Sequence, residues 1–104
     1  MDKLAALTEI LAHHPNDAFA RYGLAMELVS QTRIPEALDE FNRCIDLNPD
    51  YVPAYQMSAQ TLAIHNHREL AIARLHHGIH AAIRTGNQHA RDEMQALRDE
   101  LTQS

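Results

Sequence analysis

The sequence predicts an all-α domain of about six antiparallel helices arranged as a helical repeat, an α-α superhelix. Only 3 glycines and 4 prolines occur among the 104 residues, and the chain is rich in residues that favour helices. Its β-branched residues never alternate with polar ones over the length of a strand, so no sheet is expected. Its apolar residues also recur with a period of 34, which is typical of stacked helix pairs.

The period is clearest when residues 14–28 are laid over residues 48–62. Small and apolar residues then coincide, while positions that a helix would expose do not. The coinciding pairs are Pro15 with Pro49, Ala20 with Ala54, Ala25 with Ala59, Leu28 with Leu62, Ala37 with Ala71, Leu38 with Ile72, Phe41 with Leu75 and Ile45 with Ile79. What repeats is therefore the packing of a fold rather than a biased composition.

Residues 1–15 form the first predicted element, a single helix. Because Pro15 lies one full period before Pro49, this helix takes the second-helix place of an incomplete repeat. Its expected buried stripe is Leu4, Leu7, Ile10 and Leu11.

Residues 18–51 form the first complete repeat. Its first helix covers residues 17–30, with Asn16 or Asp17 as the N-cap, and its second covers residues 36–47. The residues expected to be buried are Ala20, Leu24, Ala25 and Leu28 on the first helix, and Ala37, Leu38, Phe41, Cys44, Ile45 and Leu47 on the second.

Residues 52–85 form the second repeat, and a charged helix over residues 87–102 caps the domain. Asp50 is expected to cap a helix that ends near Ile64. The next helix runs from about residue 69 past residue 83 and stops at Gly86. The apolar stripe of the capping helix is Ala90, Met94, Leu97 and Leu101.

This pattern over residues 18–83 resembles the tetratricopeptide repeat family, in particular its small stand-alone bacterial members. The matching places hold Leu24, Ala25, Leu28, Ala37, Phe41 and Pro49 in the first repeat and Tyr55, Ala59, Leu62, Ala71 and Leu75 in the second. Three residues depart from the family pattern: Arg21 stands where Trp is preferred, Ser58 where Leu is usual and Ile83 where a closing Pro is expected.

The resemblance implies a concave, largely apolar groove in which the chain binds a peptide or helix as a protein-interaction module or adaptor. Its lining is expected from the first helix of each repeat: Phe19, Tyr22, Met26, Val29, Gln56, Met57 and Gln60, with Ile64 as a further candidate. Family members that bind chaperone tails hold a carboxylate with Lys, Asn and Arg. Tyr22, Met26 and Met57 replace the Lys and Asn residues here, so a carboxylate would meet no clamp.

Two alternative functions remain open. The same surface could be buried in a homodimer of a self-associating structural subunit. A histidine-dependent metal site is the other: His76 and His80 are four positions apart on one helix, and His89 is a weak candidate for a third ligand. No cofactor is expected. Cys44 stands alone and is interpreted as a small buried residue rather than a reactive thiol.

The remaining features exclude other classes of function. The net charge of −5 and the scattered arginines give no basic face, so nucleic-acid binding is not expected. No catalytic triad order, glycine-rich phosphate loop or Cys-x-x-Cys pair occurs, so no enzyme activity is expected. The chain lacks a signal peptide and an apolar run of ~20 residues, which predicts a cytoplasmic protein that does not enter a membrane.

Overall fold

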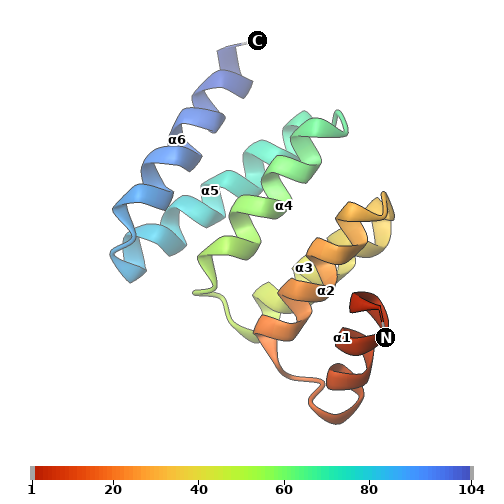
Figure 1. The fold of residues 1–104 in the computed structure, drawn as a ribbon. Coiled ribbons are helices and arrows are strands. Elements are labelled where there is room, and N and C mark those ends of the chain that lie inside the picture. The colour runs from red at the N-terminus through yellow and green to blue at the C-terminus, as the bar shows by residue number, and fades with distance from the viewer. Residues whose placement is uncertain (1, 104) are drawn as a thin grey trace. The chain divides into compact units, whose positions relative to one another are not determined.

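The computed structural model describes residues 2–103, and these residues form six α-helices and no β-strand (Figure 1). The all-α helical-repeat prediction is confirmed. The helices are α1 (Lys3–His13), α2 (Ala18–Ser30), α3 (Ile34–Leu47), α4 (Val52–Ile64), α5 (Arg68–Thr85) and α6 (Gln88–Gln103).

The helices gather in two compact units, Met1–Pro49 with α1 to α3 and Asp50–Ser104 with α4 to α6. Within the first unit α2 packs against both α1 and α3. Within the second unit α5 packs against both α4 and α6. The organisation of the whole chain as a single domain stays a prediction.

The period of the sequence is present in the backbone. Helices α2 and α4 begin one period apart, and so do α3 and α5. The turn after each first helix contains a residue with positive φ, Thr32 at 59° and Asn66 at 66°, and these two residues occupy equivalent places. After α2 the N–H of Arg33 donates to the carbonyl of Leu28 at 2.9 Å, and the equivalent bond after α4 is 2.8 Å. Both turns are therefore Schellman motifs, which satisfy carbonyls at the helix end.

The predicted helix starts are right at α2 and need correction at α4. Asp17 caps α2, because its carboxylate accepts from the N–H of Ala20 at 3.0 Å. Tyr51, not Asp50, occupies the N-cap position of α4 and makes no side-chain cap. The Asp50 carboxylate instead accepts from Nε of Arg84 at 2.9 Å, so a tertiary ion pair replaces the expected cap.

The core of the first unit is a cluster of Leu11, Ala20, Leu24, Leu28 and Ala37, with fully buried Phe41 and Cys44 on α3. Two predicted core residues are wrong: Ile10 is 43 % exposed and Leu47 is 39 % exposed. Within its unit α1 packs mainly on α2, so much of the α1 surface stays exposed. Leu47 is the last residue of α3, where the helix has already left the core.

The core of the second unit is built around the small residues of α5. A Cβ atom added at Gly78 would lie 2.6 Å from Sδ of Met94 and 2.7 Å from Cβ of Tyr55. Gly78 is buried and therefore lets α4 and α6 both approach α5. As expected, α5 continues past Ile83 and ends at Gly86, which has a φ of 72°.

Candidate functional site

The predicted groove residues lie on one helix of each unit. Helix α2 carries Phe19, Tyr22, Met26 and Val29, and helix α4 carries Gln56, Met57 and Gln60. Phe19 is the most exposed of them, at 71 %, while Val29 packs partly against the core of the first unit. The others are half-buried. The continuous groove across both repeats stays a prediction.

Tyr22 contributes to the packing of the first unit as well as to its surface. Its ring lies 6.1 Å from the ring of Phe41, at an angle of 58°. Burial raises the pKa of the Tyr22 hydroxyl above its ordinary value. Only part of this side chain is therefore available to a partner.

The Cys44 thiol lies on the buried side of α3. Burial raises its pKa to about 11, because the thiolate would lose its hydration. A reactive cysteine needs the opposite shift, a lowered pKa that favours the thiolate at neutral pH. Cys44 is therefore a small core residue, as the sequence predicts.

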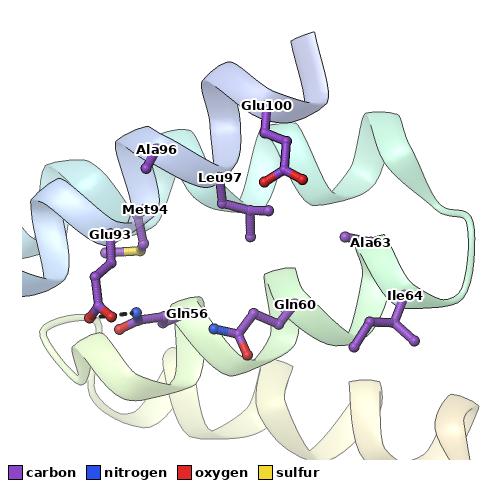
Figure 2. Close-up of a pocket in the computed structure, with 9 residues that line it drawn as sticks. All are labelled: Gln56, Gln60, Ala63, Ile64, Glu93, Met94, Ala96, Leu97 and Glu100. Carbon is purple, nitrogen blue, oxygen red and sulfur yellow. Dashed lines mark hydrogen bonds between the residues drawn. The ribbon is translucent and has the colours of Figure 1, made fainter. Parts of the chain in front are cut away.

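The second unit contains an open groove between α4 and α6, which we call the α4–α6 groove (Figure 2). Its volume is about 480 Å³. The lining residues are Gln56, Gln60, Ala63 and Ile64 from α4, and Glu93, Met94, Ala96, Leu97 and Glu100 from α6. Three of the predicted residues, Gln56, Gln60 and the further candidate Ile64, thus line one site. Met57 is on the same helix but does not line this groove.

The floor and one end of the α4–α6 groove are apolar. Leu97 points from α6 toward α4, and the thioether of Met94 lies beside it (Figure 2). Met94 is 1 % exposed, so it closes the floor against the core. Ile64 is 74 % exposed at the C-terminal end of α4. An apolar side chain from a partner would be covered on several sides here.

The polar side chains of the groove are amides and carboxylates. The Gln56 amide donates to Oε1 of Glu93 at 3.2 Å, across the groove from α4 to α6 (Figure 2). Nε2 of His89 lies 3.2 Å from the same oxygen. Glu100 lies two helical turns further along α6. Among the described residues that line the groove, none is basic.

The α6 side of this groove was not predicted from the sequence, which treats residues 87–102 only as a cap. Helix α6 begins two positions later than one full period after the start of α4, because α5 has 18 residues where α3 has 14. The 34-residue alignment of the sequence with itself therefore no longer matches equivalent helix positions at α6. The sequence does contain one signal for this wall of the groove, the apolar stripe of α6. Two of its residues, Leu97 and Leu101, are only partly buried, so they leave apolar surface that a partner could contact.

The histidines lie on the surface. His76, His77 and His80 are exposed on α5. His89 is on α6 and has Glu93 as its partner. Across residues 2–103, no group of three or more His, Cys, Asp or Glu side chains could hold a metal ion. The metal site at His76 and His80 stays a hypothesis that needs a ligand from elsewhere.

None of the helices in residues 2–103 has the length and apolar character needed to span a membrane.

No family model and no curated protein matches the sequence. Several solved structures match the fold. The TPR2B domain of yeast Sti1, solved in a pHsp70 complex, has a TM-score of 0.88 and 24 % identity, over 96 % of this chain and 80 % of that one. A tetratricopeptide repeat domain protein from Salinibacter ruber has a TM-score of 0.78 and 29 % identity, over 84 % of this chain and 88 % of that one.

The chain has the tetratricopeptide repeat fold. The resemblance over residues 18–83 is confirmed, including that to small bacterial repeat proteins. A Bordetella parapertussis protein solved in solution adds a TM-score of 0.83 at 22 % identity, over 99 % of this chain and 90 % of that one. The division into two repeats, residues 18–51 and 52–85, with a capping helix over residues 87–102 stays a prediction, and α2 to α6 begin and end close to its predicted helices.

Proposed function

We propose that this chain is a protein-interaction module that binds a peptide or helical segment of another protein in the α4–α6 groove. The observation that carries the proposal is the groove itself: an open apolar hollow of about 480 Å³ beside a closed core. A fold supports many functions, so the argument depends on this site rather than on the repeat architecture. Among the described residues, the lining contains no Ser, Thr, Cys, His or Lys side chain, and its polar groups are the amides and carboxylates described above.

Solved structures of similar fold support binding to a protein partner. The TPR2B domain of yeast Sti1 is described in a pHsp70 complex, and the TPR2AB region of the same protein in a pHSP90 complex. Their identities to this chain are 24 % and 23 %, so their partners are not transferred to it. What we carry over is the kind of interaction, a rigid repeat that binds a segment of another chain.

The exposed face of α2, with Phe19 and Met26, is proposed as a further contact surface. Phe19 is 71 % exposed, so most of this large apolar side chain does not contribute to the core and is open to a partner. Burial of the same face in a homodimer is the alternative. A mass that rises with concentration in light scattering, and that Met26→Glu abolishes, would favour the homodimer.

The proposal is tested by selecting a displayed library of random twelve-residue peptides on the purified protein. The groove variant is Ile64→Glu, and the matched control is Leu70→Glu on α5, since both residues are exposed, at 74 % and 60 %, and only Ile64 lines the groove. We expect selected peptides to bind the control like the native protein. Binding to Ile64→Glu should fall about tenfold or more, because an apolar contact is replaced by a charge.

Circular dichroism checks that both variants keep their helices. Peptides that bind Ile64→Glu and Leu70→Glu equally well would contradict the α4–α6 groove as the binding site. A selection that yields no peptide above an unrelated helical protein would contradict the proposed function.

A further inference from the structure

We infer that the segment bound in the α4–α6 groove is basic as well as apolar, with Lys or Arg residues on both sides of its buried side chain. This inference rests on the proposed function, because it names the chemistry of the partner for the same groove. It is carried by the two glutamates of α6 that line the groove, Glu93 and Glu100, and by what surrounds them.

The two carboxylates share the face of α6 that lines the groove. They are seven positions apart, so they lie two turns apart on the same side of the helix, with about 10.5 Å of axial rise between them. Leu97 lies between them and points into the groove (Figure 2). The order along the groove is therefore carboxylate, apolar side chain, carboxylate.

The other acids of α6 differ from these two. Asp92 lies 3.0 Å from its neighbour Arg91, and Asp99 lies 3.2 Å from its neighbour Arg98. Each of those carboxylates is thus next to a permanent cation outside the groove. Glu93 contacts the Gln56 amide and His89, which carries a charge only when protonated.

This arrangement selects the charge of the partner. The contacts of Glu93 with Gln56 and His89 both end on Oε1, and its side chain is 51 % exposed. A basic side chain can approach both carboxylates from the open side of the groove, whereas an acidic segment would be repelled at both ends. Cations about 10 Å apart are seven positions apart in a helix or three in an extended chain. Leu97 and Met94 then cover the apolar side chain between them.

The experiment uses the peptides selected on the native protein and two double variants. Glu93→Gln/Glu100→Gln removes both groove charges and keeps the size and shape of the side chains and one acceptor oxygen on each. Asp92→Asn/Asp99→Asn removes the same number of charges from the same helix outside the groove. Binding of labelled peptides is measured by fluorescence anisotropy at low and high salt.

We expect the selected peptides to carry net positive charge around one or more apolar residues. Their affinity should fall about tenfold for Glu93→Gln/Glu100→Gln at low salt and change less than about twofold for Asp92→Asn/Asp99→Asn. High salt should weaken binding to the native protein and remove most of the difference between the variants.

The two proposals fail in different ways. Peptides that are neutral or acidic, or that bind Glu93→Gln/Glu100→Gln as well as the native protein, overturn the inference. If those peptides still lose affinity for Ile64→Glu, the groove remains the binding site and the proposed function stands. If no selected peptide responds to Ile64→Glu, both proposals are overturned.

Discussion

The two helix pairs, α2 with α3 and α4 with α5, have the same backbone plan and different interiors. The pairs begin one period apart, and each turns through a residue with positive φ. At the place of Arg21 in the first pair, the second pair has Tyr55. Arg21 pairs with Glu40 at 3.0 Å and donates to the carbonyl of Pro15, while Tyr55 is 6 % exposed and packs beside Gly78.

The place of Cys44 in the first pair is taken by Gly78 in the second, and the reason lies in the neighbours. In the first unit the Cys44 side chain is 0 % exposed and is itself part of the core. In the second unit Met94 of α6 and Tyr55 of α4 fill the space that a side chain at Gly78 would need. The comparison indicates that turns and small residues fix the backbone of a repeat, and that the neighbouring helices decide what fills its interior.

The largest expected effect is the loss of an equivalent core side chain from each pair. Phe41 and Leu75 occupy the same place in the two repeats, and both are 0 % exposed. Phe41→Ala should lower the free energy of unfolding by about 3–5 kcal/mol, and Leu75→Ala by about 2–5 kcal/mol. Urea denaturation followed by circular dichroism measures both. Phe19→Ala is the control, because Phe19 is exposed and should change stability by less than about 0.5 kcal/mol. A Phe41→Ala protein as stable as Phe19→Ala would contradict the equivalence of the two cores.

The two helical glycines that lie inside the pairs should respond to alanine in opposite directions. Gly78→Ala should destabilise by about 1–3 kcal/mol, because the new Cβ overlaps Cβ of Tyr55, which cannot move without its helix. Gly23→Ala places its Cβ 3.2 Å from the flexible end of Leu7. It should be neutral or stabilise by up to about 1 kcal/mol, since alanine favours helix. Thermal unfolding compares the two, and a stabilised Gly78→Ala would show that α4 and α6 do not need the close approach.

A smaller effect is expected at the equivalent turns. Thr32 has a β-branched side chain at a φ of 59°, whereas Asn66 belongs to a residue type that accepts this region. Thr32→Gly should raise the free energy of unfolding by about 0.5–1 kcal/mol. Asn66→Gly should change it little, and equal gains at both turns would argue against strain at Thr32. The melting temperatures of the two variants give the measurement.

The last prediction concerns the Cys44 thiol in the core of the first pair. Its ionisation affects the free energy of unfolding only at alkaline pH. Burial raises the pKa of the Cys44 thiol from its ordinary 9.0 to about 11. Between these values the unfolded chain releases the proton and the folded chain keeps it, so this contribution to stability is full below pH 9 and is lost as pH rises to 11. Cys44→Ala should therefore show a shallower loss of stability over this window in urea titrations. Identical slopes would exclude the thiol as the cause.

The repeats could be predicted from the sequence because their signals are local. Asp17 caps its helix by a bond to a residue three positions away, and Gly86 ends α5 through its own backbone conformation. The predictions that were wrong depend on contacts between helices, which the sequence pattern does not show. Asp50 was expected to cap α4, but Arg84 from the end of α5 takes its carboxylate. Ile10 fits the apolar stripe of α1, yet it is 43 % exposed, because α1 packs mainly on α2.

The candidate site divides in the same way. The sequence by itself determined the helix pairs and their period, because these follow from the periodicity of a helix. The resemblance to the tetratricopeptide repeat family supplied three residues that line the α4–α6 groove, Gln56, Gln60 and Ile64. Only the tertiary structure decided that α6 forms the other wall and brings Glu93 and Glu100 to it. The physical reason is the length of α5, because its 18 residues move the start of α6 away from the 34-residue period. The position of α6 therefore depends on how Met94 packs against Gly78, and the repeat pattern does not predict it.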